Sequence, residues 1–239
     1  MNKLNKFWSA AFFLVLAFSC DSSTNAHKET SKADAGNPGY YIPPEIRTPD
    51  EAIAEIKAGN IRYVNHQLKN INISEMIDHT SDDQHPFVAV LGCIDSRIPA
   101  EIIFDQGIGN MFVARVAGNV EDPFILGSLE YATRVKGSKL LVVLGHNKCG
   151  AVNGAIDGVE LGNLTGLLDQ IKPAITPDKN GDRSKTSDNT TRQNVIMTMH
   201  RIHQKSPLID QLIKDGKLKM IGAYYNVTNG KVIYEDDLN

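Results

Sequence analysis

The stretch Phe87-Val-Ala-Val-Leu-Gly-Cys93-Ile-Asp-Ser-Arg97 decides the fold, and the stretch Leu140-Leu-Val-Val-Leu-Gly-His146-Asn-Lys-Cys149-Gly150 repeats its plan. In each, a short apolar run of strand length and strand composition ends at a glycine, and a soft metal ligand follows at once. The two runs are typical of neighbouring buried strands. Because open α/β sheets place their sites beyond the carboxyl ends of the strands, we expect Cys93, His146 and Cys149 to lie together there.

The residues between these two stretches predict a crossover between parallel strands. Residues 111–117 are predicted as a strand, interrupted by Arg115, which must contact a partner or point out of the core. A helical apolar pattern over about 122–136 then returns the chain to the strand before His146. Because a strand, a helix and a strand joined by short links make a parallel pair, we predict an α/β fold. Its central sheet has four or five mostly parallel strands and is flanked by helices.

Helices and a hairpin are predicted outside this core. Thr48 and Glu51 form a capping-box pattern around Pro49, which predicts a helix with a possible break at Gly59. Residues 178–187 are predicted as a polar loop. The chain ends in two β runs joined by Thr228-Asn-Gly230, which predicts a C-terminal β-hairpin. Further helices are predicted at 74–79, 99–104, 164–171, 194–204 and 207–215.

Length and charge limit the class of protein. The chain has 239 residues, of which 41% are hydrophobic and 22% charged, so it can bury one substantial core. Its formal net charge is −3, and it contains no dense block of Lys and Arg. The composition therefore gives no argument for nucleic-acid binding.

The N-terminus predicts export. Residues 1–20 form a signal with a basic start and an apolar core too short to span a bilayer comfortably. Its end, Ala17-Phe-Ser-Cys20, resembles the lipobox of bacterial lipoproteins, which implies lipidation of Cys20 and a place on the periplasmic side of a bacterial membrane. Plain cleavage and an uncleaved anchor are the alternatives. Residues 21–47 are predicted as a flexible polar tether and residues 48–239 as the folded domain.

Two cysteines remain once Cys20 is assigned to processing. A Cys93–Cys149 disulfide is the ordinary interpretation in an oxidising compartment. The presence of His146 three residues before Cys149 favours zinc instead, because zinc prefers thiolate and imidazole ligands. Asp95 could be a fourth ligand that closes the site. It could also pair with Arg97, either leaving one metal position to water or forming an ordinary turn ion pair.

The combination of Cys93-Ile-Asp95-Ser-Arg97 with His146-Asn-Lys-Cys149-Gly150 resembles the signature of the β-class carbonic anhydrases. The likeness continues through 112–119 and 127–131 and covers about residue 49 to the C-terminus. It implies a catalytic domain that reversibly hydrates carbon dioxide to bicarbonate and a proton. Cys93, His146 and Cys149 would hold Zn²⁺, and an Asp95–Arg97 dyad would assist attack by zinc-bound hydroxide.

The resemblance also implies substrate contacts and an assembly. Three residues match substrate-site positions of the plant-like subset of the family: Gln84, Phe112 and Tyr131. Gly150 is predicted to bind the substrate as well. Because family sites lie at a dimer interface, these residues could serve the zinc of a neighbouring subunit in a homodimer or larger homo-oligomer. A loop amide at Gln84 and core aromatics at Phe112 and Tyr131 are the other interpretations.

A regulated form of the family uses a Trp, Arg and Tyr cluster to bind bicarbonate at a second site. The only Trp in this chain is Trp8, in the signal, so we do not expect that regulation. The sequence still allows a state in which Asp95 binds the metal at low pH.

Three other functions fit the same residues. Zinc-bound hydroxide could attack carbon disulfide or carbonyl sulfide on the same scaffold. A non-enzymatic zinc module would keep Asp95 permanently on the metal. A redox protein would use a Cys93–Cys149 disulfide, which excludes zinc.

Overall fold

The computed structural model describes residues 45–235. The predicted export signal, the lipidation site at Cys20 and nearly all of the predicted tether lie outside these residues. None of the helices within the described range is both long enough and apolar enough to cross a lipid bilayer.

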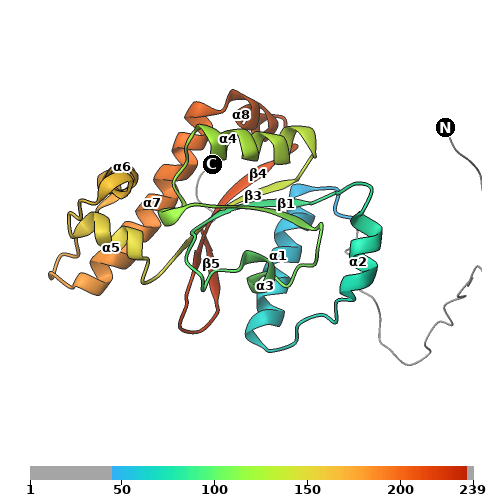
Figure 1. The fold of residues 1–239 in the computed structure, drawn as a ribbon, viewed down its shortest axis with the longest axis horizontal. Helices are drawn as coiled ribbons and strands as arrows, with labels where there is room; N and C mark the ends of the chain where they lie inside the picture. The colour runs from blue at the N-terminus through green and yellow to red at the C-terminus, as the bar shows by residue number, and fades with distance from the viewer. Residues whose placement is uncertain (1–44, 236–239) are drawn as a thin grey trace, which may run out of the picture. The chain divides into compact units, whose positions relative to one another are not determined.

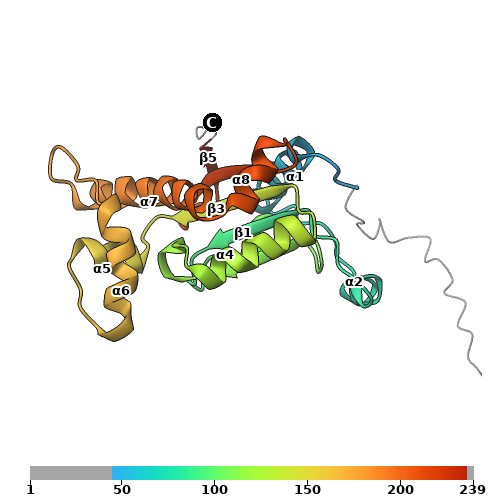
Figure 2. The same ribbon diagram turned by 90° about the horizontal axis from the view of Figure 1, so that it is seen from above.

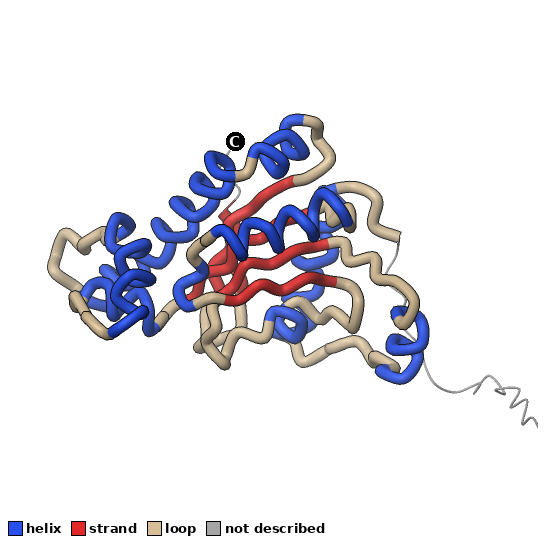
Figure 3. Tube along the Cα trace, turned by 45° about the horizontal axis from the view of Figure 1, so that its top comes forward, coloured by secondary structure: helices blue, strands red, loops and turns tan. Residues whose placement is uncertain are grey.

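Five strands form one sheet in the order β2-β1-β3-β4-β5, and Figure 3 shows them side by side. The first four are parallel, and β5 runs antiparallel to β4. The predicted fold class, with its mostly parallel sheet and C-terminal hairpin, is therefore confirmed. The strands are β1 (Val88–Gly92), β2 (Met111–Arg115), β3 (Leu140–His146), β4 (Lys219–Tyr225) and β5 (Val232–Glu235).

Helices cover both faces of the sheet (Figure 1). They are α1 (Pro49–Val64), α2 (Ile73–Thr80), α3 (Ala100–Ile103), α4 (Pro123–Glu130), α5 (Gly150–Ile156), α6 (Gly162–Ile171), α7 (Arg183–Lys205) and α8 (Pro207–Lys214). Two 3-10 turns, Ala117–Asn119 and Lys172–Ala174, and a π-helical turn, Tyr131–Val135, complete the elements between them.

The alternation of side chains along β1 divides the core into two layers. Val88 and Val90 point toward α1 and α3, whereas Ala89 and Leu91 point toward α4, α7 and α8. All residues of β1 and β3 are buried, which explains why their sequences are apolar throughout. These two strands are the centre of the sheet.

A third apolar cluster lies beyond the carboxyl ends of β1 and β3. It joins Cys93 and Cys149 to buried side chains of α5 and α6, among them Val152, Leu168 and Ile171. Figures 1 and 2 show α5 and α6 together at the left, past the end of the sheet. The candidate ligands are therefore part of a packed apolar region.

Two local predictions were wrong. α7 begins at Arg183, inside the predicted polar loop, because Asp182 caps its first turn by accepting from the backbone N–H groups of Ser184 and Lys185. α1 runs through Gly59 without a break. A Cβ on Gly59 would lie 1.9 Å from the carbonyl oxygen of Phe104, so the glycine permits a close approach of α1 to the end of α3.

Candidate metal centre

The two central strands bring the predicted ligands together. Gly92, the last residue of β1, is paired with Leu144, and β3 continues for two more residues to His146. Cys93 therefore follows β1 beside the end of β3. Cys149 is the N-cap residue of α5, three residues after His146. Because β1 has β2 on one side and β3 on the other, the site lies where the direction of strand order reverses.

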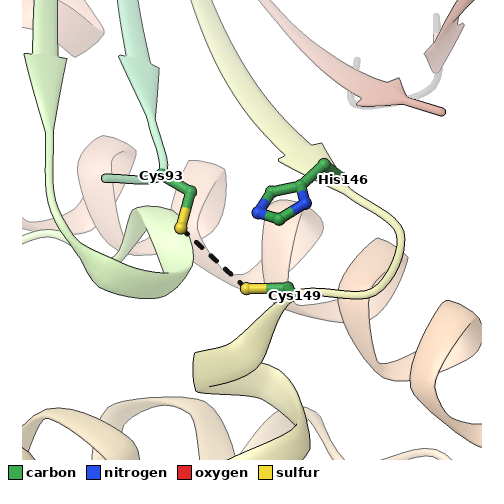
Figure 4. A group of neighbouring side chains, drawn as sticks. All are labelled: Cys93, His146 and Cys149. Carbon is green, nitrogen blue, oxygen red and sulfur yellow. Dashed lines mark hydrogen bonds between the residues drawn. The ribbon is translucent and has the colours of Figure 1, made fainter. Parts of the chain in front are cut away.

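The side chains of Cys93, His146 and Cys149 point toward one another, as Figure 4 shows. Their ligand atoms all lie within 4.8 Å of one another, and all three residues are buried. The two Sγ atoms are 4.0 Å apart, close to the roughly 3.8 Å expected for two thiolates on one tetrahedral zinc ion. Both cysteines are free, so the structure contains no Cys93–Cys149 disulfide.

The imidazole of His146 is oriented for metal binding. Its Nδ1 lies 2.9 Å from the backbone carbonyl of Asn147, a contact that favours a proton on Nδ1. Its Nε2 is fully buried and has no hydrogen-bond partner among residues 45–235. A buried nitrogen without a partner is costly unless another group binds it. The donor set therefore fits a Zn²⁺ ion.

The surroundings of Cys93 favour its thiolate form. A hydrogen bond from the Cys149 thiol lowers the pKa of Cys93 to about 4, with a further contribution from the backbone N–H of Gly118. The Gly118 nitrogen lies 3.4 Å from the Cys93 Sγ. The same contact with Cys93 raises the pKa of Cys149. The contact between the two sulfurs therefore favours the thiolate form of Cys93.

Asp95 and Arg97 form a bidentate ion pair beside these ligands. Arg97 donates from Nε to Oδ1 at 2.9 Å and from a terminal nitrogen to Oδ2 at 2.7 Å, and its backbone N–H also donates to Oδ1. These hydrogen bonds lower the pKa of Asp95 to about 2. Oδ2 of Asp95 lies 4.0 Å from Nε2 of His146. The carboxylate is therefore held at the edge of the ligand set by Arg97.

Arg115 has a role that the sequence did not assign. From the end of β2, its guanidinium donates to the backbone carbonyl of Cys93 at 2.9 Å and to that of Asp95 at 2.6 Å. It therefore fixes the loop that carries both residues. The sequence showed only that a charged residue interrupts an apolar strand; the register of the sheet, which pairs Arg115 with Gly92, brings it to the residue before Cys93.

The predicted substrate residues occupy two places. Gly150 follows Cys149 as the first residue of α5, next to the metal centre. Gln84 is exposed and precedes β1, so a strand of about 17 Å separates it from Cys93. Phe112 and Tyr131 pack edge to face, with ring centroids 5.9 Å apart, and line a hollow of about 490 Å³ beneath α4. The ligands of the centre do not line this hollow.

The sequence matches a family model described as carbonic anhydrase over residues 88–232. It is 35% identical over 198 residues to carbonic anhydrase 2 of Mycobacterium tuberculosis. The alignment covers 80% of this chain and 94% of that protein. It is also 35% identical over 192 residues to a carbonic anhydrase of Mycolicibacterium smegmatis, with 77% and 92% covered.

Solved structures share the fold. The β-carbonic anhydrase CafA of the fungal pathogen Aspergillus fumigatus aligns with a TM-score of 0.64 at 24% identity, covering 80% of this chain and 91% of that one. One of two tetrameric β-carbonic anhydrases from Sordaria macrospora aligns with a TM-score of 0.61 at 24% identity, covering 78% and 96%.

Proposed function

The chain belongs to the β-carbonic anhydrase family of zinc enzymes, which hydrate carbon dioxide reversibly, and from this premise we propose that Asp95 and Arg97 are its catalytic dyad. The observation that carries the proposal is the bidentate Asp95–Arg97 pair at the edge of the three buried ligands. Because Arg97 binds both oxygens of this carboxylate, a zinc ion held by Cys93, His146 and Cys149 would keep a position for water.

Each protein group has a distinct task in this mechanism. A zinc ion held by Cys93, His146 and Cys149 supplies a Lewis acid that makes water acidic enough to become a nucleophile near neutral pH. Arg97 lowers the pKa of Asp95 further below its usual range, and this carboxylate would accept a hydrogen bond from a water at the site and orient it toward the carbon of the substrate. Arg115 binds the backbone carbonyls of Cys93 and Asp95 and so fixes the positions of these two residues relative to each other.

Gln84, Phe112 and Tyr131 contact the substrate of a neighbouring subunit. Their position at the amino end of the sheet, a strand length from the nearest ligand, supports this assignment. So does the exposed apolar surface around the hollow under α4, where Phe124 is 86% and Tyr131 44% exposed. A homodimer or larger homo-oligomer follows, and the Sordaria macrospora relatives are tetrameric.

The protein is exported in this proposal and held on the periplasmic side of a bacterial membrane by a lipid on Cys20. The short apolar segment after two lysines and the small residue before Cys20 support it. Expression of the full chain in a bacterium with a Cys20→Ser variant tests it. Membrane fractions should hold the wild type and lose the variant. Equal distribution of both forms would contradict lipid anchoring.

The mechanism is tested with residues 48–239 purified in the presence of zinc. We expect one zinc per chain by elemental analysis and rapid hydration of carbon dioxide in a stopped-flow assay. Cys93→Ser should lose the zinc, whereas Asp95→Asn should keep it and lose most of the activity. Full activity in Asp95→Asn would refute the role of the dyad.

A further inference from the structure

Asn194 is a buried polar residue in the middle of α7, with no exposed surface. Its side-chain Nδ2 donates to the backbone carbonyl of Gly118 at 2.7 Å. The backbone N–H of Gly118 points to the Sγ atom of Cys93, 3.4 Å away. A single residue, Gly118, therefore connects the amide of Asn194 to a ligand of the metal centre.

The turn around Gly118 has an unusual backbone. Gly118 and Asn119 both adopt left-handed conformations, with φ angles of 69° and 46°. The φ angle of Gly118 favours glycine, and a Cβ there would lie 2.5 Å from Cδ1 of Ile171 on α6, which would have to move. Two consecutive left-handed residues, one of them not glycine, need external contacts to persist.

α7 supplies these contacts at two points. Asn194 binds the turn at Gly118. Two residues beyond Asn119, the carboxylate of Glu121 is fully buried and accepts from Arg201 and Lys205, each at 2.8 Å. The turn is thus fastened to one helix at Gly118 and just past its end. Of these two points, only the one at Asn194 contacts Gly118 itself, the residue whose N–H approaches Cys93.

Asn194 is a poor choice for stability alone. Its Oδ1 is buried without a hydrogen-bond partner in the part of the chain that the structure describes, and such a group is unfavourable. Asparagine also has a weak preference for helix interiors. Its Nδ2, by contrast, satisfies the buried carbonyl of Gly118, so this hydrogen bond is the contact that explains an asparagine here.

We propose that Asn194 is a positioning residue of the metal centre: by binding the carbonyl of Gly118 it fixes the backbone conformation of this residue, so that the N–H on the other side of its Cα donates to the Cys93 sulfur. Such a hydrogen bond withdraws charge from a metal-bound thiolate and fixes the direction of its lone pairs. The inference rests on the proposed function only in taking Cys93 as a zinc ligand. It makes no use of the Asp95–Arg97 dyad.

Zinc affinity tests this inference. Asn194→Leu and Asn194→Ala remove the donor, the former with a side chain that fills the space and suits a helix. Thr198→Val is the matched control, because Thr198 is also fully buried on α7 and loses one hydrogen bond, from Arg201 at 3.2 Å, without contacting Gly118. In competition with a chromophoric chelator, both Asn194 variants should bind zinc about 10- to 100-fold more weakly than the wild type, and Thr198→Val should match it.

The cobalt-substituted protein gives a second readout that folding defects do not produce. Loss of a hydrogen bond to the thiolate raises the energy of its lone pairs, so the sulfur-to-cobalt charge-transfer band should move to longer wavelength in Asn194→Leu and stay in place in Thr198→Val. Unchanged zinc affinity and an unchanged band in the Asn194 variants would overturn the inference. Tight zinc binding by a wild type that does not hydrate carbon dioxide would refute the proposed function instead and leave the comparison of variants valid.

Discussion

Arg97 joins two segments of the centre that are distant in sequence. It binds both oxygens of Asp95, and one of its terminal nitrogens also lies 3.3 Å from the backbone carbonyl of Lys148. Lys148 itself has a left-handed backbone, with a φ of 55°, between the ligands His146 and Cys149. A planar group with several N–H donors is needed to bind a carboxylate and a carbonyl at once, and Arg is the side chain that provides it.

Replacement of Arg97 by Lys tests this geometry. Lys keeps the positive charge but can approach only one carboxylate oxygen at a time, so Asp95 loses its fixed orientation. We expect kcat/KM to fall by about 10- to 100-fold in a stopped-flow assay. The zinc content should stay at the level of the wild type, because Arg97 contacts none of the three ligand side chains.

Arg134→Lys, on the surface of the π-helical turn, is the control for the general effect of this exchange. It should leave both activity and zinc content unchanged. A similar loss in both variants, or loss of zinc in Arg97→Lys, would show that Arg97 acts on stability and not on Asp95.

Single residues differ in how well the sequence predicts their roles. Cys93, His146 and Cys149 could be found because they lie at or within three residues of the ends of two apolar strands, and neighbouring parallel strands bring such positions together. Arg115 and Asn194 bind backbone carbonyls of other segments, and Gly118 donates its own N–H to the sulfur of Cys93. Such contacts between distant segments are not recorded in any local pattern. Of these residues, Asn194 is the hardest to predict, since 76 residues separate it from Gly118.

At the scale of elements, the strands were easier to predict than the start of α7. β1 and β3 are apolar because both their faces are buried. The first turns of α7 are polar although several of their residues are buried, because they bind polar groups of α5: Ser187 donates to Asn153, and Arg183 binds Asn153 and Asp157. A helix that packs through hydrogen bonds lacks the apolar periodicity on which its prediction depends.

The contact between α1 and α3 depends on a glycine. In Gly59→Ala the new Cβ would lie 1.9 Å from the Phe104 carbonyl oxygen, and a backbone atom cannot move aside easily. We expect the free energy of unfolding to fall by about 1–3 kcal/mol, measured by urea denaturation.

Gly166→Ala on α6 is the matched control. No atom lies within 4 Å of the added Cβ, and alanine favours the helix, so this variant should gain about 0.5–1 kcal/mol. If Gly59→Ala were as stable as Gly166→Ala, the two elements would not be in close contact.

At the scale of the whole molecule, the proposed site residues are divided between the two ends of the sheet. The metal centre lies past the carboxyl ends of β1 and β3, whereas Gln84, Phe112 and Tyr131 lie toward the other end. A single chain cannot bring both sets together across a folded strand. The proposed enzyme is therefore complete only as an assembly of copies.

Phe124→Glu places a charge in the most exposed part of the apolar surface around the hollow under α4. We expect the mass of the particle, measured by light scattering, to be smaller than that of the wild type. The variant should lose most of its carbon dioxide hydration and still bind zinc. Leu161→Glu, which is 67% exposed but lies outside this surface, should change neither quantity. A monomeric Phe124→Glu protein with full activity would show that each chain works alone.

The central position of β3 also determines when the sheet can be completed during synthesis. β3 ends in the ligand His146, and β4, which pairs with it over seven residues, is translated more than 70 residues later. Until the ribosome has passed Tyr225, β3 is an edge strand with unpaired backbone groups. Asn226 and Val227, which bind the side chain of Asn147 next to His146, arrive later still. A product that stops before Lys219 would therefore carry all three ligands without the strand that supports β3, and we expect it to bind zinc more weakly than the finished chain.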